Sequence, residues 1–294
     1  MSRIIIDIVL KGGVFMPFTV VVDSSADIPS RYAHEIVIVP MPVTIDSQTY
    51  LEGVDLFPDN FYPRFPSFQT LPKTSQPNLN DLIESYEKVL STGNDVAAIH
   101  LSSGLSSTVS TAALARDMSS QPERIHIIDS LGASFGYGLL ALQAAAKINS
   151  YNSWDEAEAF ILEIRNRMRY VFTLDTLEYL VKGGRVSKTA GFIGGLLDIK
   201  PILHITTDGR IEPFAKVRSR RAAIRKLVEV MEQEITTPEQ QIIGISHSDC
   251  LEDAKALEEE IRARIPVKDI WLSQIGCIVG SHTGPGTVAL FFQR

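Results

Sequence analysis

This sequence has few cysteines, no long apolar run and fewer basic than acidic residues. Only Cys250 and Cys277 occur in 294 residues, which excludes a disulfide framework and a cysteine-rich zinc site. No apolar run approaches the roughly 20 residues that a membrane-spanning helix requires. Lysine and arginine total 28 against 35 aspartates and glutamates, a net charge of −7. This balance disfavours a nucleic-acid coat, and the cysteine count is most simply interpreted as that of a reduced, cytoplasmic protein.

The motifs of the common metal, nucleotide and hydrolase sites are missing too. There is no HExxH, no Cys-x-x-Cys pair and no acidic cluster at metal-ligand spacing. There is also no GxGxxG and no Walker loop, and Gly104-Leu105-Ser106-Ser107 lacks the closing glycine of a nucleophile elbow. The sequence therefore predicts no metal and no cofactor.

What is present suffices for two globular domains. At about 150 residues per domain, 294 residues correspond to about two, and 45% hydrophobic residues can form a sizeable core. We predict an N-terminal α/β domain over residues 17–152 and a C-terminal α/β domain over 153–294. Residues 1–16 are expected to be an extension, without the cleavage site of a signal peptide.

The two halves differ in the pattern of their segments. In the first half, apolar segments alternate with amphipathic ones, which predicts a mostly parallel, Rossmann-like sheet with helices on both faces. Its strands are expected at 18–22, 36–45, 95–101 and 124–129, and its helices at 79–90, 112–118 and 134–145. In the second half, Asp208-Gly209 between apolar segments predicts a type I′ hairpin and hence a mixed or antiparallel sheet. A glycine-rich turn is predicted at 280–286.

The first candidate site is a hydroxyl-rich segment between a predicted strand and a predicted helix. It runs from His100 to Thr108 and contains Ser103 and Gly104. A helix start presents unpaired N–H groups and a positive dipole end, hydroxyls add donors, and glycine lets a ligand approach the backbone. The pattern favours a phosphate or a carboxylate, and simple helix capping is an equally weighted alternative.

Two other segments offer polar groups to a ligand of the same kind. Thr74 precedes a predicted helix in Thr74-Ser75-Gln76-Pro77, where capping is the simpler interpretation. His282 lies among three glycines in the segment 280–286, a context that favours a functional imidazole. His247, which follows a predicted strand, ranks second among the six histidines.

Basic residues gather in the second half in spite of the acidic total. Arg185 follows Lys182-Gly183-Gly184, and further lysines and arginines lie between 216 and 226. For the latter group a solvated helix face is the preferred interpretation, and a docking surface for an acidic protein or a phosphorylated ligand is the alternative. The apolar segment Gly191–Ile199 either lines a pocket or packs closely, which its periodicity does not decide.

Six motifs in a fixed order give the chain a family resemblance. They are Val22-Asp23-Ser24-Ser25-Ala26-Asp27, Thr74-Ser75-Gln76-Pro77, Ser102-Ser103-Gly104-Leu105-Ser106, Lys182-Gly183-Gly184-Arg185, Ile199-Lys200-Pro201-Ile202-Leu203 and His282-Thr283-Gly284-Pro285-Gly286. Together they resemble the DegV family of fatty-acid-binding proteins, from about residue 18 to the C-terminus. One departure is Ser107, where the family loop usually has glycine.

The resemblance implies a ligand, its contacts and a partner. A long-chain fatty acid would lie in an apolar tunnel between two α/β domains, with its carboxylate at Thr74, Ser103, the Gly104 backbone and His282. Similar family members are the acyl-binding subunit of a bacterial fatty-acid kinase. A separate ATP-binding subunit there phosphorylates the carboxylate, and the acyl phosphate enters phospholipid synthesis. Arg185 matches a family position implicated in contacting that kinase.

Two further hypotheses stay open beside this non-catalytic, fatty-acid-binding role. A stand-alone acyl hydrolase or phosphotransferase would use Ser103 and His282, with Asp129 completing a triad, but the chain lacks the elbow spacing and the nucleotide loop. A DNA-binding regulator would use the basic segment, against the net charge.

Overall fold

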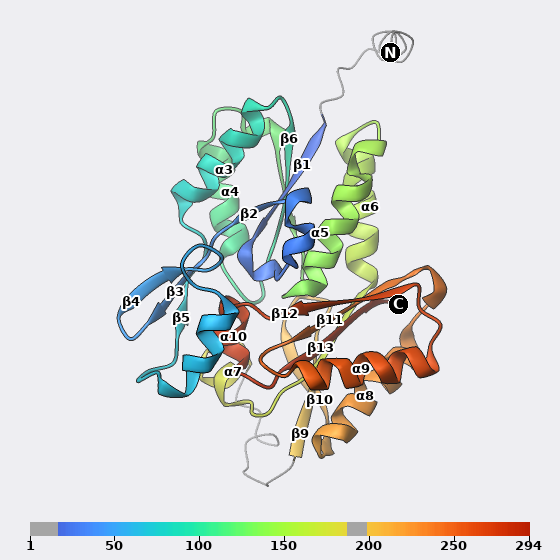
Figure 1. Ribbon diagram of the computed structural model, residues 1–294. Coiled ribbons are helices and arrows are strands. Elements are labelled where there is room, and N and C mark those ends of the chain that lie inside the picture. Colours follow the sequence, from blue (N-terminus) through green and yellow to red (C-terminus); the bar gives the residue numbers. More distant parts are fainter. Residues whose placement is uncertain (1–16, 187–198) are drawn as a thin grey trace.

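The computed structural model describes residues 17–186 and 199–294, and its two halves lie one above the other (Figure 1). The upper half is built on a four-stranded sheet in the order β2-β1-β6-β7, with all neighbouring strands parallel. Its strands are β1 (Phe18–Asp23), β2 (Val37–Val39), β6 (Asp95–His100) and β7 (Ile125–Asp129). The parallel sheet predicted for the first half is confirmed.

Helices cover both faces of this sheet because side chains alternate across each strand. Val21 of β1 packs with the layer formed by α3 (Leu79–Ser91) and α4 (Thr108–Met118). Val20 and Val22 pack with the layer formed by α5 (Phe135–Lys147) and α6 (Trp154–Arg167). Figure 1 shows one helical layer on each side of the sheet.

The polar segment near residue 152 lies between two helices that pack together, α5 and α6. Trp154 at the start of α6 stacks on His126 of β7, with ring centroids 4.1 Å apart, and lies 5.3 Å from the ring of Phe18. The chain passes to the second sheet only at Met168, where β8 begins. A polar turn between paired helices has the composition of a linker, and the domain boundary at 152 stays a prediction.

The lower half is a six-stranded sheet in the order β10-β9-β8-β13-β11-β12. Its strands are β8 (Met168–Thr173), β9 (Ile199–Ile205), β10 (Ile211–Arg218), β11 (Ile242–His247), β12 (Asp269–Gln274) and β13 (Val288–Gln293). The β11–β12 pair is parallel and the other pairs are antiparallel, so the predicted mixed sheet is confirmed. Helices α8 (Arg220–Glu234) and α9 (Leu251–Arg264) pack on one face of it.

Helix α5 joins the halves because it lies between the two sheets. It contacts β1 and β6 of the first sheet and β8, β11 and β13 of the second. Every residue from Phe135 to Leu142 is buried, as expected of a helix that is apolar all round.

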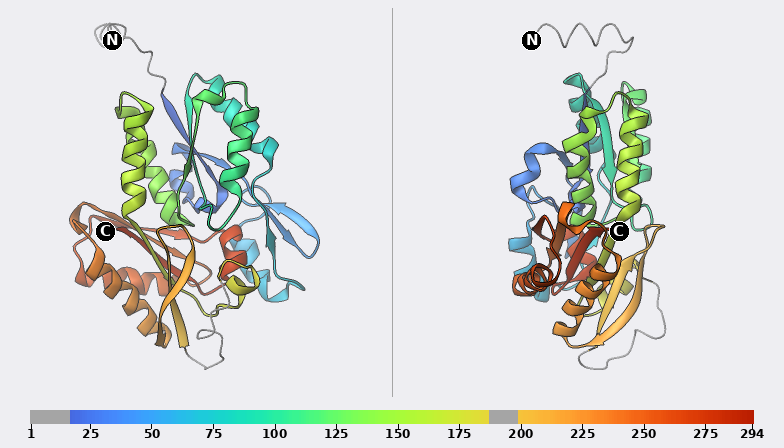
Figure 2. Two further views of the ribbon diagram at one scale, coloured as in Figure 1. Left: turned by 180° about the vertical axis from the view of Figure 1, so that it is seen from behind. Right: turned by 90° about the vertical axis from the view of Figure 1, so that its right-hand side faces the viewer.

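A small antiparallel sheet fills one end of the junction between the halves (Figure 2). It consists of β3 (Pro42–Ile45), β4 (Gln48–Leu51) and β5 (Lys73–Thr74), with the short helix α2 (Pro58–Phe61) between β4 and β5 in sequence. Against it lies α10 (Cys277–Thr283), which also contacts α7 (Glu178–Lys182). This packing brings β5 next to α10, although more than 200 residues separate them in the sequence.

Two local predictions are wrong in part. Strands β9 and β10 form the expected hairpin, but Asp208 lacks the positive φ of a type I′ turn, and Gly209 alone of the two has it, at 76°. The Thr206 side chain closes this turn instead by accepting from the Arg210 N–H. Of the turn expected at 280–286, residues 280–283 belong to helix α10 and only 284–286 form the turn, where Gly284 and Gly286 have positive φ. Gly280 lies against the Tyr62 ring, where a side chain would collide.

Within the ranges 17–186 and 199–294, no helix is long and apolar enough to cross a bilayer.

Candidate functional site

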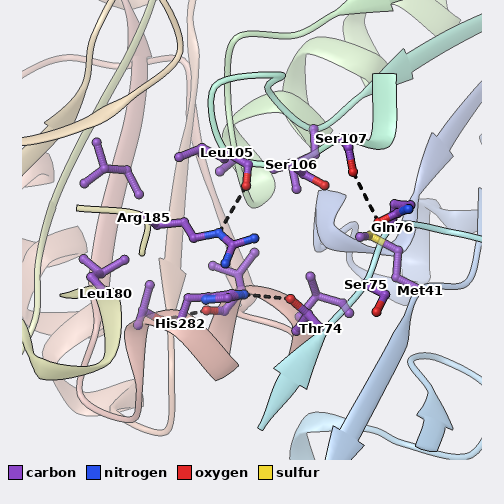
Figure 3. A pocket seen from close by; sticks show the side chains of 16 residues that line it. Met41, Thr74, Ser75, Gln76, Leu105, Ser106, Ser107, Leu180, Arg185 and His282 are labelled. Carbon is purple, nitrogen blue, oxygen red and sulfur yellow. Dashed lines mark hydrogen bonds between the residues drawn. The ribbon is translucent and has the colours of Figure 1, made fainter. Parts of the chain in front are cut away.

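A cavity lies where the small sheet, α10 and the loop after β6 meet (Figure 3). Its volume is about 100 Å³. Half of its lining residues are apolar and come from both halves of the molecule: Met41, Leu101, Leu105, Ala133, Leu180, Ile211, Ile278 and Val279. The other half are polar, and we call the side with Thr74, His282 and Arg185 the polar end. Such a lining suits a ligand that has both an apolar part and a polar group.

Thr74 and His282 form the centre of the polar end. Thr74 Oγ1 lies 2.7 Å from Nε2 of His282, as the dashed line in Figure 3 shows. Strand β5 places the threonine, and the last turn of α10 places the histidine. The structure thus brings together two residues that the sequence singled out separately.

The imidazole of His282 is neutral at pH 7. Burial, together with the nearby Arg185 cation, lowers the pKa of His282 to about 4. A neutral imidazole carries one donor and one acceptor nitrogen. With its proton on Nε2, His282 donates to Thr74 Oγ1, and the Thr74 hydroxyl is then free to donate to an anionic ligand.

Arg185 adds a positive charge to the same end of the cavity. Its Nε donates to the Leu105 carbonyl at 3.2 Å and its Nη1 donates to the Gly183 carbonyl at 2.5 Å. No carboxylate among residues 17–186 and 199–294 pairs with this guanidinium, which retains its charge although partial burial lowers its pKa. An unpaired guanidinium beside donor hydroxyls favours a carboxylate or a phosphate.

Arg185 also lines a neighbouring hollow that leads toward the surface. This hollow has a volume of about 320 Å³ and shares Thr74 and His282 with the cavity. Lys73 and Lys182 line it as well. The polar end of the cavity therefore lies close to a basic part of the protein surface.

The two predicted residues of the loop after β6 lie elsewhere. Ser103 is exposed and does not belong to the described cavity lining, and its N–H donates to Asp129 Oδ1 at 3.2 Å. Gly104 uses its N–H for a 3.1 Å bond to Ser102 Oγ. A side chain at Gly104 would collide with the Gly209 carbonyl, which accepts from Ser102 Oγ at 2.8 Å. Close approach of backbone to backbone, rather than to a ligand, explains this glycine.

Ser106 and Ser107 take the place of Ser103 in the cavity lining. Ser107 donates to Gln76 Oε1 at 3.2 Å, whereas Ser106 Oγ accepts from the Thr108 N–H and caps the start of α4. The chain reverses direction at Ser102, whose carbonyl accepts from the Ser106 N–H at 3.0 Å. A sequence with serines at 102, 103, 106 and 107 does not reveal which of them faces the cavity, because the choice depends on this turn.

The other candidates of the sequence lie apart from the cavity. His247 lines a separate surface hollow with Asp249 and Cys250. Several basic residues of α8 are ion-paired, as in Arg220–Asp253 and Arg225–Glu260, which agrees with a solvated helix face. Apart from Ile199, the apolar segment 191–199 lies outside the described residues.

These features define a class of protein: two α/β halves around an apolar cavity that ends in hydroxyls, an imidazole and a guanidinium. The chain belongs to the DegV family, whose sequence profile, described as "Uncharacterised protein, DegV family", matches residues 17–294. A DegV domain-containing protein of Clostridium perfringens is 37% identical to it over 282 residues, 94% of this chain and 97% of the relative.

Solved structures of the family share the whole fold. A DegV family protein from Thermus thermophilus, described by its fatty acid binding, superposes with a TM-score of 0.87 at 27% identity, covering 95% of this chain and 100% of the other. DegV from Bacillus subtilis, described as a fatty acid binding protein, gives a TM-score of 0.83 at 33% identity over the same shares. The predicted family and fold class are confirmed.

Proposed function

We propose that this protein binds a long-chain fatty acid in the cavity between its two halves, with no chemistry of its own. The observation that carries the proposal is the placement of Thr74, His282 and Arg185 at one end of an apolar cavity. Burial of a 16-carbon chain at roughly 0.8 kcal/mol per CH₂ contributes on the order of 10 kcal/mol. The tail therefore supplies most of the affinity, and the polar end sets the orientation and offsets desolvation of the carboxylate.

The acyl chain needs more space than the cavity provides. Ligand pockets of drug-sized molecules measure roughly 300–1,000 Å³, against about 100 Å³ for this cavity. The acyl chain therefore displaces lining side chains when it binds. Met41 suits this role because a thioether side chain adapts easily to a new shape.

Native mass spectrometry of the purified protein, followed by lipid extraction, tests the proposal. We expect either a co-purified fatty acid or stoichiometric uptake of added oleate or palmitate. Protein that is free of lipid and takes up neither acid contradicts the proposed function.

Two substitutions in the loop after β6 distinguish Ser103, the carboxylate contact predicted from the sequence, from Ser106, which lines the cavity. Ser106→Ala is expected to weaken oleate binding about tenfold to a hundredfold, the value of one hydrogen bond to a charged group. Ser103→Ala is the matched control and is expected to leave the affinity unchanged, because Ser103 is exposed. Isothermal titration with oleate measures both, and the opposite ranking restores Ser103 as the contact.

We further propose that the protein works in the cytoplasm and presents the carboxylate to a separate kinase subunit. The basic hollow beside the cavity supports this, since Arg185 lines both spaces. Arg185→Ala is expected to change oleate affinity by no more than about threefold, because its Nε and Nη1 already donate to the carbonyls of Leu105 and Gly183. It is expected to slow acyl-phosphate formation by a cognate kinase by about tenfold or more, since a cation that stabilises the transferring phosphoryl group is lost. Equal turnover of the variant and the wild type removes Arg185 from this role.

The hydrolase alternative has less geometric support. A serine nucleophile needs a base within hydrogen-bond reach, and that base needs an orienting partner. Within the described ranges, Nε2 of His282 meets Thr74 rather than Ser103, and Nδ1 has no hydrogen-bond partner. Ester hydrolysis that Ser103→Ala abolishes would reverse this ranking.

A further inference from the structure

Two buried carboxylates from the first half hold the start of helix α10, which belongs to the second half. Asp27 Oδ1 accepts from the Gly276 N–H at 2.9 Å, and Glu52 Oε1 accepts from the Ile278 N–H at 3.1 Å. Asp27 is 8% exposed and Glu52 is 6% exposed. A side chain at Gly276 would collide with both carboxylates, so the two acids lie close to one point of the backbone. We call Asp27 and Glu52 the carboxylate clamp.

The carboxylate clamp is connected to both walls of the fatty-acid cavity. Ile278, whose N–H donates to Glu52, lines the cavity, as does His282 four residues later in α10. On the other wall, Ser24 Oγ donates to Glu52 Oε2 at 2.6 Å and accepts from the N–H of the cavity residue Met41 at 3.1 Å. A shift of the Glu52 carboxylate therefore changes the hydrogen bonds that position one lining residue of each half, Ile278 and Met41.

Asp27 also contacts residues next to α5 and in β12, so it connects α10 with both of these elements. Ser134, which precedes α5, donates to Asp27 Oδ2 at 2.5 Å, and Ser273 of β12 donates to the Asp27 carbonyl. Asp27 itself has a positive φ of 48°, a conformation that non-glycine residues rarely adopt. The chain thus accepts a strained backbone to bring this carboxylate to α10.

We propose that Asp27 and Glu52 are positioning residues of the fatty-acid site, which hold the α10 wall in its binding geometry while one of the two is protonated and loosen it when both are ionised. The inference rests on the proposed fatty-acid binding. Two carboxylates with no ion pair to a lysine or arginine among the described residues repel each other when both are charged.

Among the buried titratable groups around the carboxylate clamp, only the pair Asp27 and Glu52 changes its charge near neutral pH. The titratable groups that face the clamp are Asp23 of β1, Tyr62, Tyr137 of α5 and Cys277 of α10. Burial raises the pKa of Glu52 to about 7, and burial together with the Glu52 charge raises that of Asp27. The pKa of Asp23 is lowered while those of Tyr62, Tyr137 and Cys277 are raised, so Asp23 stays charged and the other three stay neutral.

The test compares oleate affinity of the wild type and of Glu52→Gln between about pH 6 and about pH 9. Glutamine keeps an acceptor oxygen for Ile278 but cannot ionise. We expect the wild-type affinity to fall about tenfold as the pH rises over this range. A fall of this size corresponds to a difference of about one unit between the pKa of the clamp in the free and in the bound protein. The affinity of Glu52→Gln is expected to change less than about twofold. Glu178→Gln, at an exposed ion pair, is the control and should follow the wild type.

The outcomes separate this inference from the proposed function. A wild-type slope retained in Glu52→Gln overturns the inference while fatty-acid binding stands. Absence of oleate binding in the wild type at every pH contradicts the proposed function instead. In that case, amide hydrogen exchange at Ile278 tests the role of the carboxylate clamp. The exchange should be faster in the wild type than in Glu52→Gln at about pH 9, and equal rates overturn the inference.

Discussion

Replacing His282 with alanine is expected to weaken oleate binding by about tenfold to a hundredfold. The 2.7 Å contact between Thr74 Oγ1 and His282 Nε2 orients the Thr74 hydroxyl toward the ligand. Loss of this bond costs about 1.5–3 kcal/mol when the hydroxyl serves a charged group, which corresponds to that range of affinity. Isothermal titration at pH 7 is suitable, because the pKa of His282 near 4 keeps the imidazole neutral there.

A double-mutant cycle tests whether the two residues act together. Thr74→Val removes the hydroxyl with little change in shape and should weaken binding to a similar extent. The double variant should lose little more than either single one, because both substitutions remove the same contact to the carboxylate. Unchanged affinity in both single variants would place the head group elsewhere, and additive losses would show that the two residues bind independently.

Asp23→Ala is expected to lower the free energy of unfolding by about 3–5 kcal/mol, because several buried donors lose the carboxylate that accepts from them. Asp23 is fully buried at the end of β1, and Oδ2 lies 3.1 Å from Nδ1 of the buried His100. It also accepts from the Leu101 N–H at 3.0 Å and the Tyr137 hydroxyl at 2.7 Å. Removal of the carboxylate leaves these donors buried without an acceptor.

The pH dependence of the same network has a definite sign. Burial alone would raise the pKa of Asp23, but the interactions with His100 together with the hydrogen bonds from Ser25 and Leu101 lower the pKa below 3.8. A carboxyl whose pKa is lower in the folded state stabilises the protein above the unfolded pKa, and this contribution is lost as the pH falls.

Chemical denaturation of the wild type and of Asp23→Ala measures both the loss of free energy of unfolding and its dependence on pH. Glu178→Ala is the control. Glu178 pairs with Lys182 on an exposed helix face, where an ion pair contributes roughly 0–1 kcal/mol. A loss below about 1 kcal/mol in Asp23→Ala would show that the network is not needed for stability.

The structure also explains which candidate residues the sequence could identify. The sequence points to Thr74 and His282 because each stands in an unusual local context, before a helix or among glycines. It points to Ser103 in the loop after β6, whereas Ser106 and Ser107 line the cavity, because four serines in one loop have nearly the same local signal and the turn at Ser102 decides among them. The carboxylate clamp has no local signal, since Asp27 and Glu52 meet α10 only through the packing of the two halves.

By itself the sequence determined the two kinds of sheet, the order of most elements and the family, since these depend on local periodicity and ordered motifs. The tertiary structure decided which side chains meet. Thr74 and His282 are 208 positions apart, and helix α6 follows a polar turn that resembles a linker yet packs on the first sheet. Contacts of this range depend on how two sheets dock around α5, which no local pattern encodes.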